Sequence, residues 1–212
     1  MHAFAAPAIL HVDDLGFAYP GQPALASRWG KSIGAGLTLL HGDTGSGKST
    51  LLRVLAGALP ASGHLTLAGQ RLDADAAAYR RSVFLCEPAT DAFDQFSARA
   101  CTTALSEGDR RFDAAAWQAL AAGFALAPHL DKPMYMLSTG SKRKVWLAAA
   151  LASGRALTLL DEPTGGLDAG SVACLWRALA EVATRPDRAL IVASAERIDR
   201  VQLAGTIELP LG

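Results

Sequence analysis

A glycine-rich stretch constrains this chain more than any other part of its sequence. It consists of Gly42, Asp43, Thr44, Gly45, Ser46, Gly47, Lys48, Ser49 and Thr50. The spacing matches the pattern G-x-x-x-x-G-K-[ST], in which a loop surrounds phosphate groups. Glycines let successive backbone N–H groups turn toward one point without a Cβ clash. The stretch therefore predicts a loop that binds a nucleoside triphosphate; a glycine-rich turn that binds nothing is the alternative.

The segments on either side of this loop favour the same interpretation. An apolar run at 37–40 predicts a strand before the loop, and residues 50–56 after it have helical character. That helix would direct the positive end of its dipole at the phosphates. We expect Lys48 to contact the terminal phosphates and the Ser49 hydroxyl to bind magnesium.

Composition narrows the classes of partner. Half of the 212 residues are apolar, and 20 basic residues balance 20 acidic ones. Because nucleic-acid binding relies on an excess of Lys and Arg on one face, no nucleic-acid partner is expected. The densest basic run, Lys142 to Lys144, is interpreted as a solvated helix face. The three cysteines form no C-x-x-C pair, which favours a reducing cytosol over a disulfide or zinc framework.

Neither a membrane span nor a leader is expected. No apolar run approaches the ~20 residues that cross a bilayer. Residues 1–8 lack the basic start and apolar core of a signal peptide. A membrane role would therefore depend on a partner.

The order of the expected elements predicts an α/β fold. Strands are expected at 9–12, 15–19, 37–41, 65–70, 81–86, 156–160, 189–193 and 206–209. Helices are expected from 50 to near 57, at 98–124 with breaks at Gly108 and Gly123, at 142–152 and at 170–183. Alternation of strands and helices predicts a mostly parallel sheet covered on both faces. The helical block at about 88–152 interrupts this alternation and predicts a separate lobe.

Two acids at the end of an apolar strand supply the second half of the predicted site. Asp161 and Glu162 follow the expected strand at 156–160, and ligands bind at the carboxyl ends of such strands. We expect Asp161 to hold magnesium, directly or through water. We expect Glu162 to orient and deprotonate an attacking water, a role that contributes roughly 10²–10⁴ in rate. A solvated Asp-Glu turn is the alternative.

Two further segments resemble motifs of the ATP-binding cassette proteins. One is similar to their L-S-G-G-Q signature and consists of Leu137, Ser138, Thr139, Gly140 and Ser141. The other, Gly166-Leu167-Asp168, is similar to their D-loop. The resemblance covers about 9–209 and places Tyr19 as the aromatic that stacks on adenine, with a plain core tyrosine as the alternative.

The resemblance also implies an architecture. It implies a single cassette domain over 1–212, with a P-loop core around a mostly parallel sheet. A small antiparallel β subdomain and a helical subdomain at about 88–152 complete it. The short length is similar to the minimal subunits of small exporters, such as those for haem.

The family's mechanism implies the partners. Two cassettes, identical or different, would pair head to tail around two ATP molecules, so that Ser138, Gly140 and Asp168 complete the site of the partner. Ser138 and the Gly140 backbone would offer donors to the γ-phosphate at a helix start. A permease would dock near Pro88 to Arg99 and hold this cytoplasmic chain at the inner face of the membrane.

The sequence departs from the family pattern at three places. Glu87 stands where the family has a glutamine that contacts magnesium. Its carboxylate could bind the metal. Unless magnesium lies between Glu87 and the other negative charges, Glu87 should weaken ATP binding or turn outward. Ala195 stands where the family has a histidine that contacts the γ-phosphate, and the loss of such a donor typically costs about 10²–10³ in rate. Thr139 and Ser141 replace a glycine and the final glutamine of the signature.

These departures leave two functions open. The first is an ATP-hydrolysing transporter subunit that binds Mg-ATP and dimerises but turns over slowly. The second is an ATP-dependent regulatory switch or the degenerate half of an asymmetric pair. The retained Glu162 favours the first.

Overall fold

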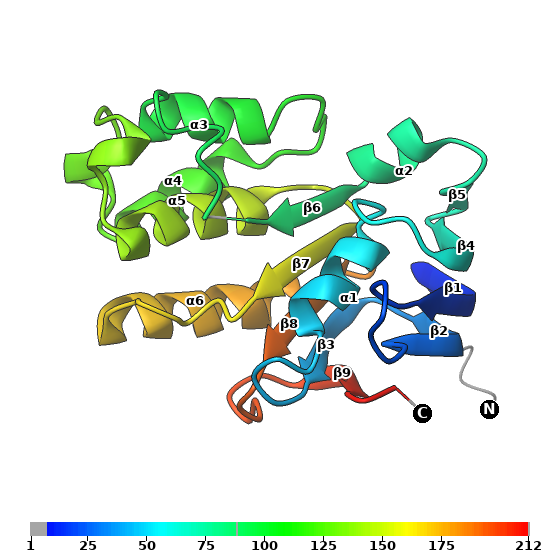
Figure 1. The fold of residues 1–212 in the computed structure, drawn as a ribbon. Coiled ribbons are helices and arrows are strands. Elements are labelled where there is room, and N and C mark those ends of the chain that lie inside the picture. The colour runs from blue at the N-terminus through cyan, green and yellow to red at the C-terminus, as the bar shows by residue number, and fades with distance from the viewer. Residues whose placement is uncertain (1–7, 88, 212) are drawn as a thin grey trace, which may run out of the picture.

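The strands form a parallel and an antiparallel sheet in the computed structural model, which describes residues 8–87 and 89–211 (Figure 1). The five-stranded sheet has the order β6-β7-β8-β3-β9, and its neighbours pair in parallel. Its strands are β3 (Gly36–His41), β6 (Val83–Cys86), β7 (Leu157–Asp161), β8 (Ala189–Ser194) and β9 (Leu203–Glu208). The four-stranded sheet is antiparallel, with the order β2-β1-β4-β5. Its strands are β1 (Leu10–Phe17), β2 (Ala26–Ile33), β4 (Ser62–Leu67) and β5 (Gln70–Arg71). The predicted fold class is confirmed.

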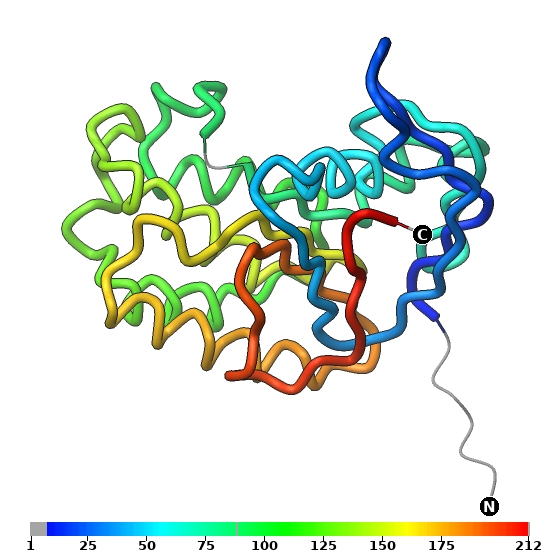
Figure 2. Tube along the Cα trace, turned by 60° about the horizontal axis from the view of Figure 1, so that its bottom comes forward, coloured from blue at the N-terminus to red at the C-terminus, as the bar shows by residue number. Residues whose placement is uncertain are grey.

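The helices divide between the two ends of the molecule and the faces of the parallel sheet. They are α1 (Lys48–Leu55), α2 (Ala76–Arg81), α3 (Ala98–Leu105), α4 (Ala114–Gly123), α5 (Thr139–Ala152) and α6 (Ala169–Val182). Short 3₁₀ turns lie at Ala127–His129 and Met134–Met136. In both views α3 to α5 lie at one end and the antiparallel sheet at the other, with the parallel strands between (Figures 1 and 2).

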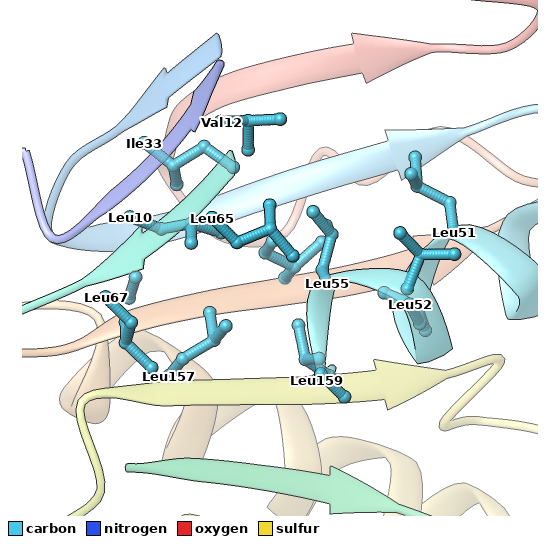
Figure 3. Packing of buried hydrophobic residues seen from close by; sticks show 14 of the residues in the cluster. Leu10, Val12, Ile33, Leu51, Leu52, Leu55, Leu65, Leu67, Leu157 and Leu159 are labelled. Atoms are coloured by element: carbon cyan, nitrogen blue, oxygen red, sulfur yellow. The ribbon is translucent and has the colours of Figure 1, made fainter. Parts of the chain in front are cut away.

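Apolar side chains cover both faces of strand β7 and hold the sheet to its neighbours. Leu157 and Leu159 belong to a cluster with α1 and the antiparallel sheet, shown in Figure 3. Leu160 points the other way, into a cluster with α5 and α6, because side chains alternate along a strand. Full burial of each such leucine stabilises the fold by about 1.5–3 kcal/mol. This packing fixes the ends of β3 and β7, where the predicted site begins.

Several predicted boundaries at the start of the chain are wrong. The strands expected at 9–12 and 15–19 are one strand, β1, which bends where Asp14 adopts a φ of 54° and the pairing register shifts. The strand expected at 65–70 ends at Leu67, because Ala68 and Gly69 both have positive φ and turn the chain into β5. Local turns, which apolar patterns do not reveal, decide both boundaries.

Other elements were missed or shifted. Strand β2 and helix α2 escape prediction, since β2 has few buried positions and α2 is only 6 residues long. The last strand starts at Leu203 rather than at 206, because Leu203 pairs with Leu37 of β3. None of the helices within the described ranges is long and apolar enough to cross a membrane.

Candidate functional site

The glycine-rich loop connects β3 to α1 and depends on its glycines. Gly45 and Gly47 have φ values of 80° and 99°, which other residues rarely adopt. A Cβ on Gly47 would also lie 2.5 Å from Leu25 Cδ1. The β1–β2 connection therefore packs against the loop, and both backbone conformation and space require glycine there.

Lys48 folds back over this loop as a buried cation. Its side chain is 7% exposed, and Nζ donates to the carbonyl oxygens of Gly42 at 2.7 Å and Asp43 at 3.0 Å. The same Nζ lies 3.4 Å from Glu162 Oε1. A positive charge thus sits beside the start of α1, where the helix dipole is also positive. This combination suits a multiply charged anion.

Ser49 and Asp161 form the metal side of the site. Ser49 Oγ donates to Asp161 Oδ2 at 2.5 Å, and Asp161 ends strand β7. A hydroxyl and a carboxylate are ligands that Mg²⁺ prefers, and this ion usually takes its other ligands from water and substrate phosphates. Within residues 8–87 and 89–211, no cluster of three or more His, Cys, Asp or Glu side chains could hold a metal alone. The oxygens therefore fit a magnesium ion that arrives with a nucleotide.

Glu162 is aimed at the loop by an unusual backbone conformation. Its φ is 41°, in a region that costs a non-glycine residue roughly 1 kcal/mol or more. Its N–H donates to the Ala193 carbonyl at 3.0 Å, and Oε1 accepts from the Ala195 N–H at 2.8 Å. Ala193 at the end of β8 thus holds the Glu162 backbone, and Ala195, just after this strand, holds its carboxylate close to Lys48. The geometry suits a group that positions and deprotonates water.

These groups surround one cavity of about 620 Å³. The described residues that line it are Thr44, Gly45, Gly47, Lys48, Ser49, Thr50, Arg143, Asp161, Glu162, Thr164, Gly165, Ser194, Ala195 and Glu196. Most of the predicted loop residues and both acids therefore meet at one place. Arg143, Thr164 and Gly165 were not predicted to lie there.

The start of α5 packs closely against the segment that follows Glu162. Ser138 caps α5, with Oγ accepting from the Ser141 N–H at 3.2 Å. A Cβ on Gly140 would collide with the Gly166 carbonyl oxygen. Ser138 and Gly140 are not among the described residues that line the 620 Å³ cavity.

Comparison with known proteins identifies this arrangement. The model of the ABC transporter family matches residues 34–165, more than half of the chain. The chain belongs to the ABC transporter family. The predicted resemblance to ATP-binding cassette proteins is confirmed.

Curated relatives of this ABC protein include ATP-binding proteins named for export and for import. The cytochrome c biogenesis ATP-binding export protein CcmA of Rhodospirillum rubrum is 37% identical over 175 residues, 74% of this chain and 71% of that protein. The protein of that name in Cupriavidus pinatubonensis is 33% identical over 216 residues, covering 95% and 92%. The cobalt import ATP-binding protein CbiO of Rhodobacter capsulatus is 36% identical over 172 residues, which span only 60% of its length.

Solved structures share the fold. An ATP-binding subunit of an ABC transporter superposes with a TM-score of 0.76 at 22% identity, covering 87% of this chain and 79% of that one. At this identity the likeness shows the cassette fold alone.

The basic run in the signature helix of this ABC protein is not a solvated face. Lys142 Nζ contacts Asp94 Oδ1 and Lys144 Nζ contacts Asp168 Oδ2, both at 2.5 Å. Arg143 donates to the Gly165 carbonyl. The prediction of a solvated face is wrong, because these three side chains bind partners on other segments. Asp94 lies before α3, and Gly165 and Asp168 lie in or next to the D-loop.

Tyr19 lies at the surface beside the loop. Its side chain is 42% exposed, and its hydroxyl is 3.3 Å from Thr50 Oγ1. Its ring packs edge-to-face with Phe17, with centroids 5.1 Å apart. The alternative of a core tyrosine is therefore wrong, and the exposed ring remains available for stacking.

The two departures near the phosphates have distinct surroundings. Glu87 Oε1 accepts from Arg53 Nε at 2.8 Å, a partner that sequence reasoning missed. Ala195 gives its N–H to Glu162. His41 pairs in register with Ser194, but its Nδ1 contacts Glu208 at 2.8 Å and lowers the pKa of that carboxyl. Within the described lining of the cavity, no histidine takes the place that Ala195 leaves.

Proposed function

We propose that this chain binds Mg-ATP and hydrolyses it slowly to power a separate membrane-spanning permease. The observation that carries the proposal is the meeting of buried Lys48, the Ser49–Asp161 pair and Glu162 around one cavity. Family membership supports ATP as the nucleotide. The cassette would span 1–212, with the helical lobe at about 88–152 built on the apolar cluster around α5.

Each group has a role in this proposal. Lys48 and the N–H groups of residues 42–50 would hold the phosphates, and Tyr19 would stack on adenine. Ser49, Asp161 and, if it leaves Arg53, Glu87 would hold magnesium, which neutralises phosphate charge when bound. Glu162 would take the proton of the attacking water.

The second cassette would complete the site. Ser138 and Gly140 lie outside the cavity of their own chain, which supports their acting on the nucleotide of a partner. Asp168 would join them from the D-loop. We propose a head-to-tail pair with a second cassette, either a copy of this chain or a different one, closed by ATP.

The permease would dock near Pro88 to Arg99 and hold the chain at the cytoplasmic face of the membrane. Pro88 lies outside the described residues. In the described part, Phe96 is 43% exposed, and the neighbouring Tyr135 and Met136 are 56% and 59% exposed. The Met134 N–H donates to the Phe96 carbonyl and the Tyr135 N–H to the Asp94 carbonyl, so the two backbone segments that carry these apolar residues are adjacent. An exposed apolar surface of this kind supports a protein partner.

Glu162→Gln tests the proposal. Purified chain should release phosphate slowly, and the variant should release it roughly 10²–10⁴ more slowly while still binding ATP. Glu181→Gln, on the exposed face of α6, is the matched control and should keep the rate of the unmodified chain. Size-exclusion chromatography with ATP should show a dimer that the Glu162 variant retains. Absence of ATP binding, or full turnover in the Glu162 variant, would contradict the proposal.

The alternative function is an ATP-dependent switch or the degenerate half of an unequal pair. The observation that favours it is Ala195, which occupies a position in the described lining of the phosphate cavity where the family has a histidine. A chain that binds ATP and dimerises, yet hydrolyses none, would favour the switch. Co-purification from detergent with an integral membrane protein would favour the transporter.

A further inference from the structure

An ion pair joins α1 to the end of β6 at the edge of the nucleotide site. Arg53 Nε donates to Glu87 Oε1 at 2.8 Å, and the side chains are 54% and 41% exposed. Arg53 is in the last turn of α1, and Glu87 follows β6 directly. The helix that carries Lys48 and Ser49 thus also fixes the carboxylate that replaces the family's glutamine.

This pair adjoins the metal side of the site. Arg53 and Glu87 line a second cavity, of about 390 Å³, together with Ser49 and Asp161. Ser49 and Asp161 also line the 620 Å³ cavity, so the two cavities meet at these residues. A charge on Glu87 is therefore felt where a triphosphate and its metal would lie.

The charges around the nucleotide site indicate that Arg53 neutralises Glu87. Asp161, Glu162 and Glu196 already place three carboxylates around the 620 Å³ cavity, against the two cations Lys48 and Arg143. An uncompensated Glu87 would add a fourth negative charge next to a triphosphate, and like charges at short range repel strongly. With Arg53 bound to it, the carboxylate is both neutralised and held on α1.

We propose that Arg53 is a positioning residue for the nucleotide, holding and neutralising Glu87 so that a triphosphate binds beside this carboxylate. The inference rests on the proposed function. It predicts that the contribution of Arg53 to ATP affinity exists only while residue 87 is a carboxylate. It also predicts a smaller contribution when Mg²⁺ is present, because the metal supplies positive charge at the same place.

A double-mutant cycle tests this coupling through binding alone. Affinity for a fluorescent ATP analogue is measured in EDTA at low salt for the unmodified chain, Arg53→Gln, Glu87→Gln and the double variant. Arg53→Gln should weaken binding about tenfold, and the double variant should bind within about threefold of Glu87→Gln. Raising the salt should shrink the defect of Arg53→Gln.

Two further variants serve as controls. Arg71 makes a similar exposed pair with Asp73, Nε to Oδ1 at 2.9 Å, with side chains 49% and 50% exposed. Arg71 is next to Leu72, which packs against Gly57 after the C-terminal end of α1, the end opposite Lys48. Arg71→Gln should therefore keep the affinity of the unmodified chain. Arg53→Lys keeps the charge and should bind within about threefold of the unmodified chain; this comparison decides the matter if Arg53→Gln does not fold.

Failure of the inference about Arg53 and failure of the proposed function give different results. If Arg53→Gln weakens binding as much in the Glu87→Gln background as it does in the unmodified chain, Arg53 acts on the phosphates directly. That result would overturn the inference. No loss in Arg53→Gln, or a tenfold loss in Arg53→Lys, would overturn it too. If the unmodified chain binds no ATP and Lys48→Ala changes nothing, the proposed function itself fails.

Discussion

The Ser49 hydroxyl donates to Asp161 Oδ2 at 2.5 Å, although 112 positions separate the two residues in the chain. The contact arises because β3 and β7 both pair with β8 in parallel and end at the same edge of the sheet. The phosphate-binding loop leaves one strand at that edge, and the acidic pair ends the other. One sheet edge therefore collects the groups for the phosphates, the metal and the attacking water.

Lys48→Ala should abolish useful affinity for ATP. The variant loses the buried cation that lies 3.4 Å from Glu162 Oε1, and charge-assisted contacts to phosphate are strong. We expect binding of a fluorescent ATP analogue to weaken at least about 100-fold. Lys132→Ala, at an exposed position, is the control and should leave the affinity unchanged. Comparable affinity in the two variants would contradict the role of Lys48.

Ala195→His should raise the rate of ATP hydrolysis. Ala195 lines the phosphate cavity, and its N–H already holds Glu162 Oε1 at 2.8 Å. A side-chain donor added there would stabilise developing charge, an effect worth up to about 10²-fold. Phosphate release by Ala195→His is compared with that of Ala195→Leu, which adds bulk without a donor. A gain in both variants, or in neither, would argue against a missing donor as the cause of slow turnover.

Gly140→Ala should destabilise the contact between the signature and the D-loop. The added Cβ would collide with the Gly166 carbonyl oxygen, so backbone must shift, at a cost of about 1–3 kcal/mol in the free energy of unfolding. Gly34→Ala is the matched control, because a Cβ there meets nothing within 4 Å. Urea unfolding of the two variants checks the difference, and equal stabilities would show that the D-loop yields without cost.

Arg188→Met should lower stability through the far end of the signature helix. Arg188 is 1% exposed, and its guanidinium donates to the carbonyls of Ala150 and Leu151 and to Thr158 Oγ1. Burial lowers its pKa to about 10. Its removal takes the Arg188 donor from the Leu151 carbonyl and from Thr158 Oγ1, whereas the Ala150 carbonyl keeps the Ser153 N–H. We expect a loss of about 2–5 kcal/mol in the free energy of unfolding, measured with urea.

The neighbouring Arg185 provides the control for Arg188. It is 42% exposed and lies 3.9 Å from Asp187. Arg185→Met should therefore change the free energy of unfolding by less than about 1 kcal/mol. A similar loss in both variants would mean that the contacts at the end of α5 contribute little.

Asp168→Asn should reduce stability in a pH-dependent way. Asp168 caps α6 and accepts from Lys144 and Ser171, and these hydrogen bonds, led by that from Lys144, hold its pKa well below the ordinary 3.8. A carboxyl whose folded pKa is lowered contributes stability above its unfolded pKa and loses it as pH falls through the folded value. Asparagine keeps the cap but loses the charge. The difference in free energy of unfolding between the unmodified chain and Asp168→Asn should be largest near neutral pH and should decrease below pH 3.8. A difference that does not change with pH would contradict the role of the Asp168 charge.

Much of the site was predictable because its chemistry is local. The glycines of the loop, Lys48 and the Asp161-Glu162 pair are recognised by spacing within a few residues, and each follows an apolar strand. Strand β7 is buried along its length up to Asp161, as its apolar run indicates. Helix α2 and strand β2 were missed because neither has a strong apolar period.

The sequence by itself determined the phosphate-binding loop, the acidic pair and the α/β fold, because backbone freedom, apolar period and motif spacing are properties of neighbouring residues. Only the tertiary structure decided where charged side chains find their partners. Arg53 meets Glu87 across 34 positions, and Lys144 meets Asp168 across 24. Such pairings depend on which strands lie side by side and how far each helix runs. Long side chains then select among partners within reach, so the charge balance of the site emerges only in the folded chain.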